Sequence, residues 1–334
     1  RFLAALRAMQ IGNKPALKSA LLLVVAVAVG LLLGEGAVRA AIRVLHHPPL
    51  FVGDPRTGWI GRPNFDDETI VVSGGRFRVT TDSLGHRVMP ASPPTDNRPT
   101  VVLVGDSFVY GLNVDDHDTF AWQLAEQMPE RHFINLGAPG WDTCQEWLDL
   151  ARFFKGSRET TVRDVVVMVY ENDFLDVQRS SDPWLGRRRP IFHVVDNRLV
   201  GGEFHLTGIE RLMDRSRLAW LVRSKLALLT RQSDFDPHRG TDVVLACLEN
   251  MKAEIESHHA RPVILAHRRI GHPPTLGQKS WVEFLAKSGA MDITDSIRLG
   301  SKSNPLGFDK LHWSKEGNRR AAEVVRNDLS VMRQ

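Results

Sequence analysis

The feature that most constrains the fold is an alternation of strand-like and helix-like segments from Thr100 to residue 331. The strand-like runs are apolar and rich in β-branched residues, and they lie at 101–104, 132–136, 164–170 and 262–266, with a weaker run near 291–293. Helical patterns separate and follow them, at about 117–128, 142–155, 241–258, 279–288 and 314–331. Strands that are apolar on both faces and joined by helices form parallel sheets. We therefore expect an α/β protein, a three-layer α/β/α sandwich.

An apolar stretch precedes this region. The sixteen residues from Ser19 to Gly34 carry no charge, and apolar character continues beyond Glu35. Sixteen helical residues cover about 24 Å of a hydrocarbon core about 30 Å thick, so a spanning helix needs part of the continuation. Basic residues precede the stretch, which predicts a cytoplasmic N-terminal side. We expect residues 1–45 to be an uncleaved membrane anchor, with a cleaved signal peptide, a buried core helix and an interfacial helix as alternatives.

Composition limits the class of protein. With 43% hydrophobic and 25% charged residues, the 334-residue chain is typical of globular proteins. Its net charge of +4 is mild. The sequence has no basic stripe interleaved with aromatic residues, so we do not expect nucleic-acid binding. The histidines show no metal-ligand spacing, so we expect neither a metal nor a cofactor. Cys144 and Cys247 are predicted to be buried thiols rather than a disulfide.

Two segments flank or interrupt the alternating pattern. Residues 46–98 predict a β-hairpin around a turn at 73–75, followed by a proline-rich linker into a core domain at 99–334. An insertion at about 177–240 has helical periodicity from Ile209 to Leu229. Residues 177–231 hold eleven Lys and Arg against five Asp and Glu, a net charge of +6. This segment is either a solvated surface or a cap that meets an anionic glycan or lipid headgroups.

A serine follows the first predicted strand of the core. Ser107 lies in Gly105-Asp106-Ser107, at the carboxyl end of a strand, where open α/β sheets place their ligands. A serine nucleophile needs a general base, and the base needs an orienting partner. Asp309 and His312 can supply both from one loop. The alternatives are that Ser107 or Asp309 serves only as a helix cap.

Polar and glycine motifs also follow the next two predicted strands. Asn135-Leu-Gly-Ala-Pro-Gly140 ends the second strand, and Glu171-Asn172-Asp173 ends the third. Gly140 could serve simply as a turn glycine, and Asn172 as a turn former. If both converge on Ser107, they can donate hydrogen bonds to a developing oxyanion.

The order of these motifs resembles the SGNH hydrolase superfamily, also called GDSL-type lipases and esterases, over roughly residues 100–330. The resemblance implies Ser107 as nucleophile, His312 as general base and Asp309 as its orienting residue. It also implies an oxyanion hole made by the backbone N–H groups of Ser107 and Gly140 and the side-chain amide of Asn172. The implied fold is a five-stranded parallel sheet of flavodoxin-like order, preceded by the membrane helix and the hairpin segment.

One position departs from that family. Tyr170 stands two residues before Asn172 where the family usually has glycine, so a bulky phenol could narrow the acyl pocket. The run Thr81-Asp-Ser-Leu-Gly-His-Arg87 resembles a turn found upstream of the serine in membrane-anchored bacterial members.

The resemblance implies an ester hydrolase, an esterase or deacetylase that acts on an O-acylated carbohydrate of the bacterial envelope or of an exported polysaccharide. The expected location is the inner membrane, with a single span and the catalytic domain on the periplasmic side. The expected partners are an acylated carbohydrate or small ester and the membrane, without nucleic acid. An O-acyltransferase using the same residues, and a non-catalytic glycan-binding or scaffold protein, are the alternatives.

Overall fold

The computed structural model describes residues 15–45, 49–70, 76–90, 98–156, 162–182, 184–229, 235–271, 273–299, 305–307 and 310–331. Asp309, the turn at 73–75 and most of the proline-rich linker lie outside the described residues.

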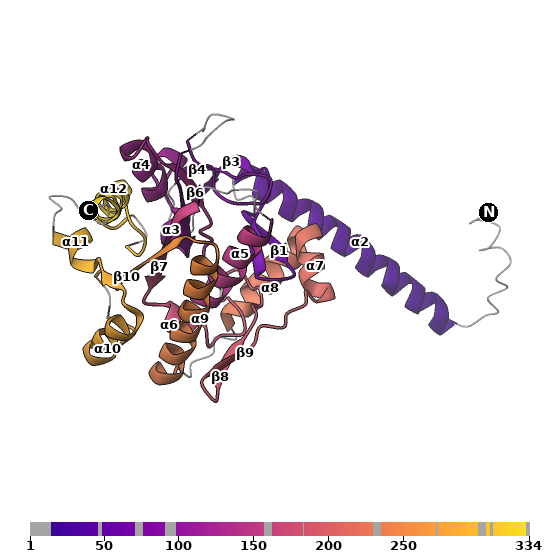
Figure 1. The fold of residues 1–334 in the computed structure, drawn as a ribbon. Coiled ribbons are helices and arrows are strands. Elements are labelled where there is room, and N and C mark those ends of the chain that lie inside the picture. Colours follow the sequence, from indigo (N-terminus) through magenta and orange to yellow (C-terminus); the bar gives the residue numbers. More distant parts are fainter. Residues whose placement is uncertain are drawn as a thin grey trace.

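A five-stranded parallel sheet forms the centre of the molecule (Figure 1). Its strands are β5 (Thr100–Gly105), β6 (His132–Asn135), β7 (Val162–Tyr170), β10 (Arg261–His267) and β11 (Met291–Asp292). They lie in the order β11-β10-β7-β5-β6, and every neighbouring pair is parallel. This is the flavodoxin-like order, so the predicted sheet is confirmed.

Helices cover both faces of the sheet. One face packs against α5 (Thr143–Gly156), α6 (Asp173–Asp176), α9 (Pro237–Ser257) and α10 (Gln278–Ser288). The other packs against α3 (Ser107–Tyr110), α4 (Phe120–Gln127), α11 (Thr294–Leu299) and α12 (Lys315–Val331). Neighbouring strand residues face opposite cores, as Val165 and Val166 do, because side chains alternate along a strand. The predicted three-layer sandwich is confirmed.

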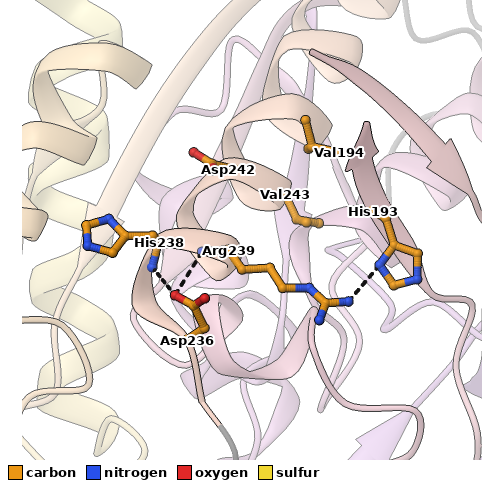
Figure 2. Close-up of a pocket in the computed structure, with 7 residues that line it drawn as sticks. All are labelled: His193, Val194, Asp236, His238, Arg239, Asp242 and Val243. Atoms are coloured by element: carbon orange, nitrogen blue, oxygen red, sulfur yellow. Dashed lines mark hydrogen bonds between the residues drawn. The ribbon is translucent and has the colours of Figure 1, made fainter. Parts of the chain in front are cut away.

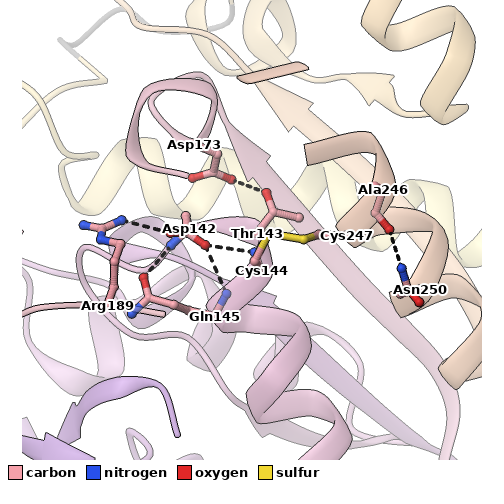
Figure 3. The surroundings of a disulfide bond; sticks show 9 residues. All are labelled: Asp142, Thr143, Cys144, Gln145, Asp173, Arg189, Ala246, Cys247 and Asn250. Atoms are coloured by element: carbon pink, nitrogen blue, oxygen red, sulfur yellow. Dashed lines mark hydrogen bonds and ion pairs between the residues drawn. A yellow bond between two sulfur atoms is a disulfide. The ribbon is translucent and has the colours of Figure 1, made fainter. Parts of the chain in front are cut away.

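A disulfide joins Cys144 of α5 to Cys247 of α9, with an S–S distance of 2.00 Å (Figure 3). The prediction of two buried thiols was therefore wrong. The two residues are 103 positions apart, and only the packing of α5 and α9 on one face of the sheet brings their Cα atoms within 5.2 Å. That proximity satisfies the geometry of a disulfide.

The N-terminal helix α2 (Pro15–Val44) leaves the body of the molecule as a single long rod (Figure 1). Its segment Lys18–Val44 is long and apolar enough to cross a membrane, and its most apolar 18-residue window has a mean hydropathy of 2.5 and is not buried. The predicted helix is therefore present, and its side chains are not part of a core.

Along the chain, two antiparallel strand pairs come between α2 and β5. The first, β1 (Phe51–Asp54) and β2 (Gly58–Gly61), has no counterpart among the sequence predictions. The second, β3 (Asp66–Ile70) and β4 (Arg76–Thr80), flanks the predicted hairpin turn.

The insertion after β7 contains the strand pair β8 (Phe192–Val195) and β9 (Arg198–Gly201), followed by α7 (Gly208–Arg215) and α8 (Arg217–Leu229). The continuous helical periodicity at 209–229 is divided at Ser216, whose backbone is extended. The Ser216 hydroxyl accepts a hydrogen bond from the N–H of Ala219 at 3.1 Å, so it caps the new helix α8.

Candidate active site

The turn after β5 holds Ser107 rigidly. The Oδ1 atom of Asp106 accepts a hydrogen bond from the N–H of Phe108 at 2.9 Å, so Asp106 is the N-cap of α3 and Ser107 is its first residue. A Cβ atom on Gly105 would lie 2.3 Å from Cγ2 of Val109, so only glycine allows this close approach. The alternative in which Ser107 serves as the helix cap is therefore wrong.

Ser107 and His312 meet across 205 positions of sequence. The Ser107 Oγ lies 2.9 Å from the His312 Nε2, within hydrogen-bond distance. The loop that carries His312 is fixed by Asn318 of α12, which donates to the carbonyl of Trp313 at 3.2 Å and accepts from the N–H of Phe120 at 2.9 Å. The nucleophile–base pair expected from the sequence is thus in contact.

Asn113 lies beside the other nitrogen of the imidazole, and the sequence analysis missed it. Its Nδ2 is 3.4 Å from the Nδ1 of His312. As placed, this nitrogen points its N–H groups toward Nδ1, and a half-turn of the amide would instead let Oδ1 accept from Nδ1–H. The Nε2 lone pair would then face Ser107, as a general base requires.

Arg87 fixes the loop that carries Asn113. Its side chain is buried and donates to the carbonyls of Gly111 and Val114 and to the carboxylate of Asp116. Asn113 itself has a φ of 73°, in the left-handed region that asparagine tolerates better than most residues. Neither this left-handed backbone nor the contact of Asn113 with His312 can be read from the sequence. The orienting role of Asp309 stays a prediction, since Asp309 is outside the described residues.

Gly140 follows β6 and faces the same edge of the sheet as Ser107. Its φ is 76°, and a Cβ atom there would lie 2.8 Å from Oδ2 of Asp182, so the backbone needs glycine. The N–H of Ala138 donates to the carbonyl of Gly105 at 3.1 Å and so ties this loop to the nucleophile turn.

Asn172 follows β7 at that same edge, because β5 lies between β6 and β7. Its Nδ2 donates to Oδ2 of Asp176 at 2.7 Å. An amide nitrogen carries two N–H groups, so this bond fixes the side chain and leaves a second donor for a ligand.

An aromatic cluster packs beneath Ser107 and His312 in the core. Phe108 packs against Tyr170, His267, Trp313 and the ring of His312, with ring centroids 4.4 to 5.2 Å apart. Tyr170 is 4% exposed and stacks on His267, so its phenol fills the core rather than an open acyl pocket. Burial lowers the pKa of His267 to about 3, which keeps this second histidine neutral.

Several carboxyl groups close in sequence to Ser107, Gly140 and Asn172 are buried. Asp142 pairs with Arg189 at 3.1 Å, and Asp173 accepts from the hydroxyl of Thr143 at 2.9 Å (Figure 3). The carboxyl group of Glu146 has no hydrogen-bond partner among the described residues. Burial raises the pKa of Asp106 to about 7. Burial, followed by repulsion from Asp173, raises that of Glu146 well above its ordinary value.

Two other polar groups lie apart from the catalytic pair. The ligand atoms of Asp115, His117 and Asp118 lie within 4.8 Å of one another, but Lys315 already pairs with Asp118 at 2.6 Å. A cavity of about 420 Å³ lies between β8 and the start of α9, where the Arg239 guanidinium donates toward His193 (Figure 2). Its lining residues are His193, Val194, Asp236, His238, Arg239, Asp242 and Val243. It contains none of the predicted site residues.

Comparison with known proteins gives structural likenesses only. No protein-family model matches the sequence, and no curated protein matches it. The psychrotrophic esterase EstA from Pseudoalteromonas sp. is similar over 70% of this chain and 98% of its own, with 12% identity and a TM-score of 0.42. A member of the lipolytic protein G-D-S-L family from Veillonella parvula is similar over 70% and 99%, with 10% identity and a TM-score of 0.40. AlinE4, an SGNH-hydrolase family esterase, is similar over 71% and 98%, with 14% identity and a TM-score of 0.33.

Proposed function

We propose that this chain is a serine-dependent ester hydrolase. The observation that carries the proposal is the 2.9 Å contact between Ser107 Oγ and His312 Nε2 at the carboxyl edge of the sheet. In the first step Oγ attacks the ester carbonyl while Nε2 takes its proton, and that proton then passes to the departing alcohol. Water, deprotonated by the same nitrogen, then attacks the acyl-serine; the acyl–Oγ bond breaks, Oγ takes the proton back from Nε2, and the acid is released.

The oxyanion of each step would be stabilised by the N–H groups of Ser107 and Gly140 and by the amide of Asn172. Three features support this assignment: the motifs follow adjacent strands, Gly140 has a left-handed backbone, and Asp176 fixes Asn172. Each well-placed donor contributes about 3–4 kcal/mol to transition-state stabilisation. Asp309 is proposed to orient His312 together with Asn113.

The proposed location is the bacterial inner membrane, with α2 as a single span and the catalytic domain outside the cytoplasm. Basic residues before α2 favour this orientation. The Cys144–Cys247 disulfide also supports it, since disulfides persist in oxidising compartments. The proposed substrate, an O-acylated carbohydrate of the envelope or of an exported polysaccharide, rests on the resemblance to anchored family members.

Hydrolysis of p-nitrophenyl acetate by the full chain in detergent tests the reaction. Ser107→Ala should lower kcat by at least about a thousandfold, because it removes the nucleophile. Ser83→Ala, at an exposed serine, is the matched control and should leave kcat unchanged. A fluorophosphonate should label Ser107 in the wild-type protein. Equal rates for Ser107→Ala and wild type, or labelling of another residue, would show that the site is assigned wrongly.

Product analysis with an O-acetylated oligosaccharide and an unacetylated acceptor sugar separates hydrolysis from transfer. Release of acetate alone supports the hydrolase. Acetate transferred to the acceptor would instead identify an O-acyltransferase with the same nucleophile. Absence of both products and of fluorophosphonate labelling would favour a non-catalytic glycan-binding protein.

A further inference from the structure

The end of the apolar stretch of α2 is bonded to the start of α8. The Glu35 carboxylate accepts hydrogen bonds from the hydroxyl of Ser216 at 2.7 Å and from the N–H groups of Arg217 and Leu218, each at 2.9 Å. These N–H groups have no partner within α8 itself, so Glu35 caps α8 from another helix. Arg39 adds a bond from its guanidinium to the carbonyl of Arg215 at 2.7 Å. The membrane-spanning candidate thus holds the junction of α7 and α8 (Figure 1).

Apolar side chains continue from this junction along α8. Leu218, Val222 and Leu226 follow one another at intervals of four residues, so they share a face of the helix. Leu218 packs on α2 at Gly34, where its Cδ2 lies 3.2 Å from the position of a Cβ atom. Val222 and Leu226 are 50% and 49% exposed. This apolar face of α8 is therefore in contact with α2 at Leu218 and is exposed to solvent farther along, at Val222 and Leu226.

The neighbouring helix α7 adds to this surface. Ile209 and Leu212 are 54% and 50% exposed. Single exposed apolar residues are ordinary. Ile209 and Leu212, however, lie close to the α7–α8 junction, which is hydrogen-bonded to Glu35 of α2. The leucines at 31–33, just before Glu35 in α2, are exposed as well.

The exposed charged side chains around the apolar surface of α7 and α8 are basic. Arg211, Arg215 and Lys225 are exposed, and α8 contains no acidic residue. The acidic residues of α7 are engaged by the preceding loop: Glu210 is buried against Arg188, and Asp214 pairs with Arg187. Anionic lipid headgroups attract basic residues at a membrane surface. Amphipathic helices with a basic polar face lie in that interface.

We propose that α7 and α8 form a membrane-contact surface, in which Val222, Leu226, Ile209 and Leu212 enter the outer interface of the bilayer that α2 crosses. Arg211, Arg215 and Lys225 then lie among anionic headgroups. This inference rests on the proposed anchor. According to this inference, the catalytic domain rests against the bilayer surface through α7 and α8, in addition to its connection through α2.

Spin labels on the full chain in vesicles of phosphatidylcholine and phosphatidylglycerol test the contact. Single substitutions Val222→Cys and Leu226→Cys report on the surface, Leu23→Cys reports on the anchor, and Val282→Cys, at an exposed apolar residue of α10, is the matched water-exposed control. Both native cysteines are in the disulfide, so each label has one attachment point. Accessibility to oxygen measures contact with lipid, and accessibility to a nickel chelate measures contact with water.

The expected result is an oxygen-to-nickel ratio several-fold higher at positions 222 and 226 than at 282, and higher again at 23. Vesicles of phosphatidylcholine alone should lower the ratio at 222 and 226 but not at 23, because only the basic residues of the surface need anionic lipid. A high ratio at 23 with water-like values at 222 and 226 would overturn the contact surface and leave the anchor standing. Water-like values at 23 as well would reject the anchor and, with it, this inference. Protection of 222 and 226 from both reagents would overturn it in favour of a protein partner or a second copy.

Discussion

His312 is positioned on both of its nitrogens. Nε2 faces Ser107 at 2.9 Å, and Nδ1 lies 3.4 Å from the amide of Asn113. A histidine acts as a base through one nitrogen only when the other holds the proton. We therefore expect Asn113, with its amide turned so that Oδ1 accepts from Nδ1–H, to act on the reaction as a positioning residue through the imidazole.

Removing the Asn113 amide should lower kcat by about five- to tenfold and leave KM unchanged, since a hydrogen bond contributes about 1 kcal/mol. Asn113→Gly is the suitable change, because glycine tolerates the left-handed backbone at this position. Asn113→Asp should keep most of the activity and move the acid limb of the pH–rate profile to higher pH, because a carboxylate stabilises the imidazolium. Wild-type kcat in Asn113→Gly, or an unmoved profile in Asn113→Asp, would contradict the positioning role.

The buried carboxyl groups make stability depend on pH. Burial and the neighbouring carboxyl groups raise the pKa of Glu146 in the folded protein, whereas in the unfolded chain this residue titrates normally. The folded protein then holds a proton that the unfolded chain has lost, so the free energy of unfolding falls as pH rises above the unfolded pKa. This loss is at most about 1.4 kcal/mol per pH unit for one group.

Glu146→Gln keeps the shape of the side chain and removes the titration. Urea unfolding in detergent, measured between about pH 5 and 7, should therefore show a shallower loss of stability in this variant than in the wild type. Glu249→Gln, at an exposed glutamate, is the matched control and should keep the wild-type slope. Identical slopes for Glu146→Gln and wild type would mean that Glu146 is ionised in the folded protein.

Among the secondary-structure elements, strand β2 supports the loop of Gly140, the proposed oxyanion donor. The indole N–H of Trp59 donates to the carbonyl of Pro139 at 3.0 Å, and the indole N–H of Trp141 donates back to the carbonyl of Trp59 at 3.0 Å. These two bonds flank Gly140 in sequence. A strand of the segment before the core thus holds the loop that presents the Gly140 N–H.

Trp59→Phe should lower kcat for p-nitrophenyl acetate by about fivefold, since it keeps the apolar ring but removes the bond of about 1 kcal/mol to Pro139. Trp122→Phe is the matched control, because the indole of Trp122 bonds to Glu126 within α4. Steady-state kinetics and thermal unfolding on both variants separate loop position from loss of fold. Equal kcat in Trp59→Phe and wild type would show that β2 does not position the loop.

Short contacts and ion pairs connect the Gly140 loop with the surface beside α2. Asp182 lies where a Cβ atom on Gly140 would meet its carboxylate, and it shares a loop with Arg187 and Arg188, which pair with Asp214 and Glu210 of α7. The α7–α8 junction is in turn bonded to Glu35 of α2. A series of neighbouring groups therefore joins α2 to the candidate active site.

The disulfide between α5 and α9 is the covalent link between distant segments, which are 103 positions apart. Closing a loop of about 100 residues contributes about 4.7 kcal/mol in the chain-entropy model, and removal of native disulfides costs about 2–5 kcal/mol. Replacing Cys144 and Cys247 together by alanine should lower the free energy of unfolding by about 2–5 kcal/mol in urea denaturation. A reductant should destabilise the wild-type protein and leave the double variant unchanged. An equal free energy of unfolding of the wild-type protein with and without reductant would argue against the Cys144–Cys247 disulfide.

The sequence alone was sufficient for the central sheet, the helices on both its faces and the apolar helix α2. Those features depend on side-chain periodicity and burial within short segments, which a sequence displays directly. It also placed Ser107, Gly140 and Asn172 at one edge, because parallel strands end together.

Tertiary structure decided what depends on contacts between distant segments. It paired Cys144 with Cys247, set Asn113 beside His312, placed Trp59 under the oxyanion loop and capped α8 with Glu35. The partners in these contacts are between 80 and 199 positions apart. Local patterns carry no record of such pairs, because each arises only when the packed sheet brings two otherwise ordinary segments together.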